Sequence, residues 1–236
     1  MVCQKCDLHL SRKNAVPGEG PSSVELMFIG EGPGFYENEQ GRPFVGQAGK
    51  FLDELLAKAG VTREDVFITN VVKCRPPGNR DPLPDELGAC RGYLERQIEA
   101  LNPQVIVTLG RYSMAHFLPN AKISSAHGKA TWVNGRLVVA MYHPAAALHQ
   151  PSLKETVLND FSHLPEFIQQ AKKVKQGRTI PAGAPSAPAA PPAAQHSEQQ
   201  SLLDLFNAPK PAPEEPPAAP ADDDTDDSSP VQLSLF

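Results

Sequence analysis

Four short apolar runs, separated from one another by helical patterns, constrain the fold of this 236-residue chain most strongly. The runs are rich in Val, Ile or Phe and span residues 26–29, 66–69, 105–109 and 137–141. Runs of this length and composition are typical of strands buried on both faces. Apolar residues at helical spacing predict helices at 48–59, 84–101, 110–118 and 160–171. We therefore expect an α/β fold with a central, mainly parallel, four-stranded sheet and helices on both of its faces.

The composition changes near residue 175, where Pro and Ala begin to dominate. Such a segment cannot bury enough apolar surface to offset the entropy cost of ordering it. We expect a folded domain over 1–174 and a disordered, acidic tail over 175–236. The formal charge is +3 over 1–178 and −8 over 179–236, which together give the −5 of the whole chain. A mildly basic body suits a nucleic-acid-binding protein, although many other enzymes share this balance.

All four cysteines of the chain can form one ligand set. Cys3 and Cys6 make a C-x-x-C pair, and Cys74 and Cys90 follow far downstream. Four thiolates are typical of an iron–sulfur cluster or of a structural zinc site. No apolar run approaches the roughly 18 residues of a membrane span, and the N-terminus has no secretory signal. We therefore expect a reducing, cytoplasmic compartment without disulfides or a membrane partner. Free or redox-active thiols are the alternative interpretation.

Residues suited to ligand binding follow three of the four predicted strands. The sequence Gly-Glu-Gly-Pro-Gly at 30–34 is a tight loop that lets backbone approach a ligand closely. Phe44, within Gly-Arg-Pro-Phe-Val-Gly, could stack on a flat ligand, and Asn70 could pair with an amide edge. His143 precedes a proline that holds it extended. Each also has a plain structural interpretation, as a core side chain, a turn cap or a structural histidine. Because ligands of such sheets bind beyond the carboxyl ends of the strands, their coincidence favours a site there.

Taken together, these segments resemble the family 4 uracil-DNA glycosylases, the iron–sulfur branch of their superfamily. The resemblance covers about residues 1–170 and rests on the four cysteines and on the segments 30–34, 41–46, Asn70 with 72–77, and His143-Pro144. It implies a three-layer α/β sandwich that flips uracil out of single- or double-stranded DNA. Hydrolysis of the N-glycosidic bond would then leave an abasic site for base excision repair. It also implies a 4Fe–4S cluster on Cys3, Cys6, Cys74 and Cys90, and a nucleoid-associated location.

The resemblance implies roles for individual residues. Phe44 would stack on the flipped uracil, and Asn70 would hydrogen-bond its edge and reject cytosine. His143 would donate a hydrogen bond to the uracil carbonyl oxygen as negative charge grows on the leaving base. The segment after His143 would enter the DNA at the vacated position through Leu148.

The group that activates water has two candidates. Gly30, Glu31 and Gly32 would lie against the base and the attacking water, and Gly32 stands where another branch of the superfamily has a carboxylate. Glu31 and Glu37 are the nearby carboxylates that could act in catalysis. The family often has Glu-Asp where this chain has Glu37-Asn38, so no acid acts at position 38.

Two apolar islands interrupt the predicted tail, at 200–206 and 232–236. Both place a glutamine before leucines and a final phenylalanine, and they resemble the peptides by which bacterial proteins bind the replication sliding clamp. Short motifs on disordered tethers are a common mode of recognition. We expect the tail to recruit a monomeric protein to the clamp, whereas unspecific apolar contacts are the alternative.

Two other functions fit parts of the sequence. The chain could be a non-catalytic adaptor that binds DNA and the clamp, or a zinc-stabilised hydrolase of free nucleotides. A related branch of the superfamily captures DNA covalently through a histidine in a basic loop, but the corresponding segment here, 75–81, has no histidine. No lysine beside the motifs is placed as a nucleophile, so the sequence favours hydrolysis by water.

Overall fold

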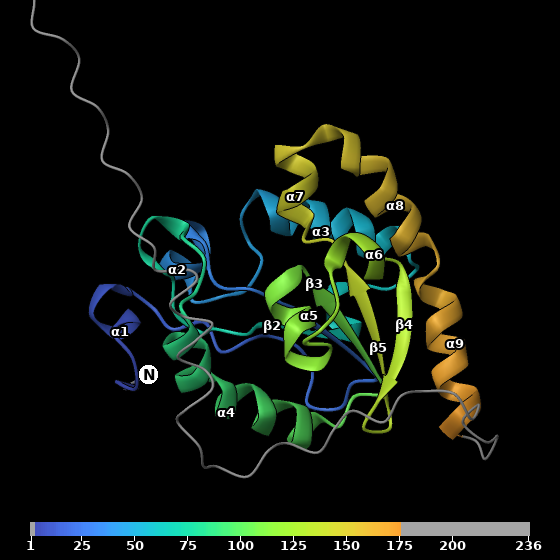
Figure 1. Ribbon diagram of the computed structural model, residues 1–236, viewed down its shortest axis with the longest axis horizontal. Coiled ribbons are helices and arrows are strands. Elements are labelled where there is room, and N and C mark those ends of the chain that lie inside the picture. The colour runs from blue at the N-terminus through green and yellow to red at the C-terminus, as the bar shows by residue number, and fades with distance from the viewer. Residues whose placement is uncertain (1–2, 176–236) are drawn as a thin grey trace, which may run out of the picture. The chain divides into compact units, whose positions relative to one another are not determined.

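The computed structural model describes residues 3–175 (Figure 1). The predicted tail over 175–236, with its islands at 200–206 and 232–236, lies outside the described residues apart from Lys175. The domain boundary and the disorder of the tail therefore stay predictions. Within residues 3–175, no helix is both long enough and apolar enough to cross a membrane.

A five-stranded mixed sheet lies at the centre of this domain, in the order β2-β1-β3-β5-β4. Its parallel strands match the four predicted runs and are β1 (Leu26–Gly30), β2 (Val66–Asn70), β3 (Val105–Leu109) and β5 (Arg136–Met141). The prediction of a four-stranded sheet is wrong, because β4 (Lys129–Val133) pairs antiparallel with β5 at the edge. Side chains of β4 are mostly half-buried, so the strand lacks a continuous apolar run. Asn134-Gly135, both at positive φ, make the tight turn between β4 and β5 and are the signal that the sequence offered.

Helices cover both faces of the sheet. They are α1 (Leu8–Ser11), α2 (Phe35–Gln40), α3 (Gln47–Lys58), α4 (Pro84–Leu101), α5 (Arg111–Phe117), α6 (Ile123–Ala126), α7 (Pro144–His149), α8 (Lys154–Ser162) and α9 (Leu164–Lys175). The single helix predicted at 160–171 is wrong, because α8 ends and α9 begins within it. Pro165 has no backbone N–H and is tolerated only in the first turn of a helix, so a new helix starts there.

Side chains of each central strand alternate between two apolar layers. Leu26 and Phe28 pack with residues of α3, α7, α8 and α9, whereas Met27 and Ile29 pack with residues of α4 and α5. Figure 1 shows α3, α7 and α8 on one side of the sheet and α4 on the other. The predicted three-layer arrangement is confirmed, and it explains why these strands are mainly apolar and buried on both faces.

The carboxyl ends of the parallel strands meet at one edge of the sheet. Gly30, the last residue of β1, is in register with Asn70, the last residue of β2. On the other side of β1, the ends of β3 and β5 are in register through Leu109 and Met141. The loops that carry the predicted site residues therefore leave the sheet side by side.

Candidate active site

A cavity of about 510 Å³, which we call the edge cavity, opens where these loops meet. Its lining residues are Glu31, Gly32, Pro33, Gly34, Glu37, Phe44, Ala48, Asn70, Pro76, Asn79, Arg80, Asp81, Pro82, His143, Ala145 and His149. The edge cavity therefore brings together most of the predicted site residues, namely Glu31, Gly32, Glu37, Phe44, Asn70 and His143.

Asn70 presents a buried oxygen that lacks a hydrogen bond. The residue is 1% exposed, and no group in the described part of the chain donates to its Oδ1. A buried acceptor without a donor costs about 1–3 kcal/mol, and because Asn70 lines the edge cavity its oxygen is available to a ligand there. Gly30 lets the side chains of Asn70 and Phe44 lie close to the backbone of β1. A Cβ at this position would lie 2.4 Å from Oδ1 of Asn70 and 2.6 Å from Cζ of Phe44. Gly30 itself does not line the cavity, so its predicted contact with the base stays a prediction, and its lack of a side chain leaves space for Asn70 and Phe44.

Phe44 forms a flat wall of the cavity in an unusual backbone conformation. Its φ is +52°, in a region that bulky residues rarely adopt. Arg63 donates a hydrogen bond of 3.0 Å to the Phe44 carbonyl and another to the Pro43 carbonyl, which hold this conformation in place. Gly49 lets α3 approach closely, since a Cβ there would lie 1.9 Å from the Phe44 carbonyl oxygen. The Phe44 ring lies 5.5 Å from the His143 ring, with 28° between their planes.

His143 has a defined tautomer. The backbone N–H of Ala145 donates to its Nδ1 over 3.1 Å, so the proton of the neutral ring is on Nε2. Burial lowers the pKa of His143 to about 4, although the nearby Glu37 opposes this shift. The ring is therefore neutral near pH 7 and offers Nε2–H as a hydrogen-bond donor.

Glu37 holds two loops of the cavity together. Its Oε1 accepts hydrogen bonds of 2.8 Å from the backbone N–H groups of Val45 and Gly46, and its Oε2 accepts one of 3.1 Å from Gly34. These contacts fix the 30–34 loop against the segment that carries Phe44. They give Glu37 a positioning role, while its predicted catalytic role stays a prediction.

Glu31 is the other predicted carboxylate. It is half-buried in the cavity wall, and burial together with the negative charge of Asp81 raises the pKa of Glu31 to about 7, despite the opposing charge of Arg111. A carboxyl group that titrates near pH 7 is suited to accept or donate a proton. Of the two predicted carboxylates, Glu31 has the better electrostatic setting for catalysis.

One rim of the cavity consists of residues that were not predicted from the sequence. Asn79, Arg80 and Asp81, on the loop between β2 and α4, line it, and Asp81 forms an ion pair with Arg111 at the start of α5. The proline pair that opens this loop was the available signal for a rigid, functional segment. Leu148 is not in the lining; it is 45% exposed on α7, next to His149, so its predicted entry into DNA stays a prediction.

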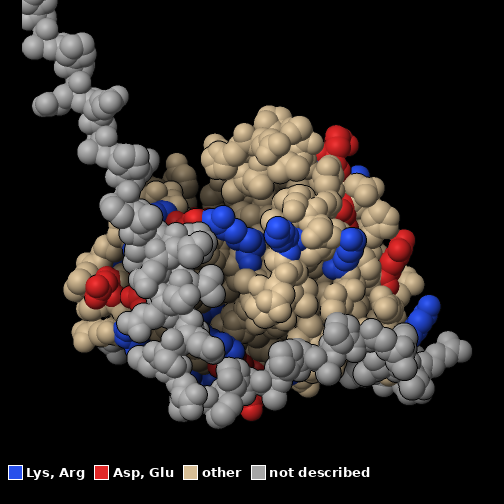
Figure 2. Space-filling view, in the orientation of Figure 1, with Lys and Arg blue, Asp and Glu red and all other residues tan. Residues whose placement is uncertain are grey.

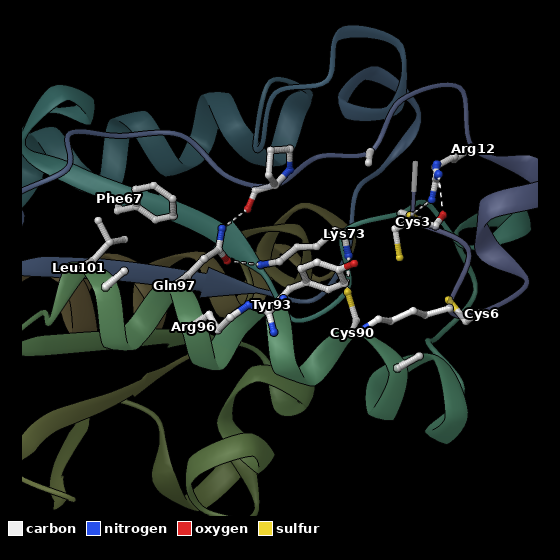
Figure 3. Close-up of a pocket in the computed structure, with 16 residues that line it drawn as sticks. Cys3, Cys6, Arg12, Phe67, Lys73, Cys90, Tyr93, Arg96, Gln97 and Leu101 are labelled. Atoms are coloured by element: carbon white, nitrogen blue, oxygen red, sulfur yellow. Dashed lines mark hydrogen bonds between the residues drawn. The ribbon is translucent and has the colours of Figure 1, made fainter. Parts of the chain in front are cut away.

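The four predicted ligand cysteines line a second cavity of about 350 Å³, which we call the cysteine cavity. Figure 3 shows Cys3, Cys6 and Cys90 around it. Burial raises the pKa of the Cys90 thiol, and the neighbouring Cys74 and Cys6 thiols raise it further. Among residues 3–175, however, no three His, Cys, Asp or Glu side chains are placed to hold a metal ion.

The surroundings of these thiols nevertheless suit a thiolate-bound group. Arg12 donates a hydrogen bond of 3.3 Å to Sγ of Cys74, and the backbone N–H of Lys73 donates one of 3.3 Å to Sγ of Cys90. Such donors stabilise sulfur atoms that carry negative charge. The donor set and the mainly apolar walls therefore fit an iron–sulfur cluster as well as zinc.

Lys73 connects the two cavities. It lines the cysteine cavity, and its buried Nζ donates a hydrogen bond of 2.7 Å to Oε1 of Gln97 (Figure 3). The same Nζ donates hydrogen bonds of 2.7 Å to the backbone carbonyl of Asn70 and 2.6 Å to Oγ1 of Thr69. Lys73, three residues after Asn70, is thus part of the packing between the two cavities.

The fold and the site define an α/β protein with a cavity at the carboxyl ends of its parallel strands, lined by the Phe44 ring and by Asn70, whose buried amide oxygen lacks a donor. The sequence matches the family model of the uracil DNA glycosylase superfamily over residues 17–172. It is 49% identical over 177 residues to the type-4 uracil-DNA glycosylase of Archaeoglobus fulgidus. The alignment covers 71% of this chain and 88% of that relative. It is 52% identical over 176 residues to that of Saccharolobus solfataricus, with 70% and 82% covered, and 45% identical over 173 residues to that of Thermotoga maritima, with 71% and 90% covered.

The chain therefore belongs to the uracil-DNA glycosylase superfamily and, within it, to the type-4 enzymes. The family predicted from the sequence motifs is confirmed, and a glycosylase is favoured over the adaptor and the nucleotide hydrolase.

Proposed function

We propose that the protein excises uracil from DNA by hydrolysing the N-glycosidic bond of a nucleotide extruded from the strand. The unpartnered, buried Oδ1 of Asn70 is the observation that carries this proposal. Uracil has an N–H at ring position 3 that this oxygen would accept, whereas cytosine has an acceptor there. The Phe44 ring supplies a stacking surface in the same cavity, and Nε2–H of His143 supplies a donor for a carbonyl oxygen.

Extrusion brings the target bond into the cavity at a cost of a few kcal/mol, which contacts to the DNA backbone would offset. Figure 2 shows Lys and Arg side chains in a row across the face that carries α5 and α6. These cations would contact phosphates and hold the strand while the uridine leaves the stack.

Cleavage of the bond leaves a sugar cation and a uracil anion, so donors aimed at the anion lower the barrier. The neutral His143 ring is suited to this task, because it donates without a prior change of protonation. Water is the nucleophile in this mechanism. Lys73, the lysine three residues after Asn70, is not available for attack, because its Nζ is buried and donates to three acceptors.

We assign activation of the attacking water to Glu31, whose ionised form would accept the proton. Because the pKa of Glu31 is about 7, kcat/KM should rise as the pH rises through 7 and then level off. We expect Glu31→Gln to lose this limb and about 100-fold or more of kcat/KM. Profiles of kcat/KM against pH for both proteins check this, and an unchanged limb in the variant would remove Glu31 from the mechanism.

Glu37→Gln should act through position rather than protonation. An amide has only one acceptor oxygen, so at least one of the N–H groups of Gly34, Val45 and Gly46 would face its NH₂ group. We expect a loss of about 1–3 kcal/mol in the free energy of unfolding and a higher KM. Urea unfolding and steady-state kinetics measure both. Glu39→Gln is the matched control, because Glu39 pairs with Lys13 at the surface. Equal effects of the two variants would contradict the positioning role of Glu37.

Cys3, Cys6, Cys74 and Cys90 would hold a 4Fe–4S cluster. When bound, such a cluster would supply metal–thiolate bonds that fasten the N-terminal segment to the loop after β2, through Cys74, and to α4, through Cys90. The N–H···S contacts to Cys74 and Cys90 support this assignment. Visible absorbance and iron content of the purified protein test it, and a colourless protein containing only zinc would reject the cluster.

Release of free uracil from an oligonucleotide with a single uridine tests the proposed function. We expect the cluster-loaded protein to release uracil, to leave an alkali-labile abasic site, and to spare a matched cytosine oligonucleotide. Binding of the DNA without any release would instead favour the non-catalytic adaptor.

The tail motifs, outside the described residues, support a further part of the proposal. We infer that a monomer works in the cytoplasm on the nucleoid, tethered to the sliding clamp through 200–206 and 232–236. Retention of a purified clamp by the full chain, compared with a chain that ends at residue 175, tests the tether. Equal retention by both would exclude it.

A further inference from the structure

Two exposed aromatic side chains, Phe35 and Tyr36, lie beside the edge cavity but do not line it. Phe35 is 51% exposed and Tyr36 is 57% exposed, and they are the aromatic members of the exposed large hydrophobic residues in the described chain. They open α2 directly after the 30–34 loop. Their neighbours in sequence, Gly34 and Glu37, both line the cavity. The pair is therefore continuous with the rim of the proposed uracil site.

The two rings are braced rather than loose. The Phe35 and Tyr36 centroids lie 5.4 Å apart with 84° between the ring planes, which is an edge-to-face contact. The guanidinium carbon of Arg75 lies 5.3 Å from the Phe35 centroid, and Nε of Arg75 donates a 2.7 Å hydrogen bond to Oδ1 of Asn79. Asn79 lines the cavity, so the brace ends in the cavity wall. We call Phe35, Tyr36 and Arg75 the aromatic shelf.

The chemistry of the aromatic shelf indicates what would cover it. Exposed aromatic rings attract a flat partner that can stack, and the Arg75 cation beside them attracts negative charge. A nucleotide combines these properties, because its base stacks on aromatic rings and its phosphate pairs with a guanidinium. An apolar protein surface would match the rings but would leave Arg75 without an anion.

We propose that the aromatic shelf stacks a nucleobase adjacent to the extruded uridine, with Arg75 beside the phosphate of that nucleotide. This proposal rests on the function proposed above. When the uridine leaves the strand, its neighbour loses one stacking partner, and the shelf replaces it. The gain is greatest in single-stranded DNA, where the neighbouring base is not held by a complementary strand.

The test combines a change in the protein with a change in the DNA. The full-length wild type and the Phe35→Ala, Tyr36→Ala double variant act on single-stranded oligonucleotides with one uridine. In matched oligonucleotides an abasic spacer replaces either the 5′ or the 3′ neighbour. For the wild type we expect one of the spacers to lower kcat/KM by about 5- to 100-fold, the range for loss of one stacked base. The double variant should lose a similar factor on the intact strand and nothing further with that spacer.

Two controls separate stacking from other effects. Leu10→Ala removes a side chain that is 75% exposed on α1 and should not alter any of these rates. The Phe35→Leu, Tyr36→Leu double variant keeps apolar surface without a ring and should behave like the alanine variant. For oligonucleotides that contain uracil opposite guanine in a duplex, the loss in the double variant should be smaller.

The outcomes distinguish failure of the shelf from failure of the proposed function. If the double variant loses the same factor with and without each spacer, or loses nothing, the shelf does not bind a neighbouring base and the proposal is wrong. In the second case a protein partner becomes the better occupant. If the wild type releases no uracil, binding of oligonucleotides with 2-aminopurine beside the uridine still decides the point. Fluorescence of the 2-aminopurine should be quenched by the wild type and not by the double variant. Equal quenching by both proteins would contradict the proposal that the aromatic shelf stacks a base.

Discussion

Asn70→Ala should release uracil about 100- to 1,000-fold more slowly than the wild type, measured as kcat/KM on a single-uridine oligonucleotide. The variant removes the acceptor that the proposal pairs with N3–H of uracil. That N–H would then be buried without a partner, and the cavity would no longer distinguish uracil from cytosine by this contact. Asn70→Asp should be at least as slow, because a carboxylate at this position repels the anion that forms on the leaving base.

The stability of the same variant separates this role from that of a turn cap. Asn70→Ala removes a buried acceptor that has no donor in the described protein, so its urea midpoint should not fall. Thr69→Val is the neighbouring control. Oγ1 of Thr69 donates to the Pro17 carbonyl over 2.8 Å and accepts from Lys73, so this variant should lose stability while keeping most of its activity. A fall in the stability of Asn70→Ala with little change in rate would identify Asn70 as a structural residue.

The parallel strands, and the edge of the sheet at which the predicted site residues gather, could be predicted because both follow from local patterns. The run 105–109 is buried throughout and apolar except for Thr108, since both faces of the strand are covered by helices. β4 could not be found in this way, because it is an edge strand with half-buried side chains. The break between α8 and α9 depends on Pro165, which the helical spacing of apolar residues does not register.

Within the site, the sequence identified residue types but not the contacts that decide their chemistry. Glu31 and Glu37 looked equivalent, yet Glu37 accepts three backbone hydrogen bonds and Glu31 is desolvated near Asp81. The tautomer of His143 depends on the N–H of Ala145, two residues away. The Asp81–Arg111 ion pair joins the loop after β2 to the start of α5, which follows β3. The ion pair and the surroundings of Glu31 are set by tertiary packing and have no signature in a single sequence.

His143→Ala should lower kcat by about 100- to 1,000-fold, the usual effect of removing one donor to a developing anion. KM should change much less, because the donor matters most when charge has formed on the base. His143→Gln keeps an N–H donor and should recover part of the rate. His163→Ala is the matched control, since His163 is exposed and its ring makes a hydrogen bond to the Asn159 carbonyl, outside the cavity. A similar loss in both histidine variants, or a change confined to KM, would contradict the role.

The pH dependence of the two titrating residues gives an independent check. The pKa of His143 is about 4 in the folded protein and ordinarily 6.5, so between these values the unfolded chain binds more protons. Its contribution to stability is therefore present above pH 6.5 and is lost as the pH falls towards 4, and His143→Gln should flatten this slope in urea unfolding.

Glu31 has the opposite sign. Its pKa is raised from 4.5 to about 7, so its contribution to stability is present below pH 4.5 and is lost as the pH rises through 7. In the rate profile, a neutral His143 requires no proton change between pH 5 and 8, so the limb near pH 7 belongs to Glu31. The limb should survive in His143→Gln at a lower rate and vanish in Glu31→Gln. A limb that vanished with His143 instead would mean that the histidine is charged when it acts, and the mechanism would need a protonated donor.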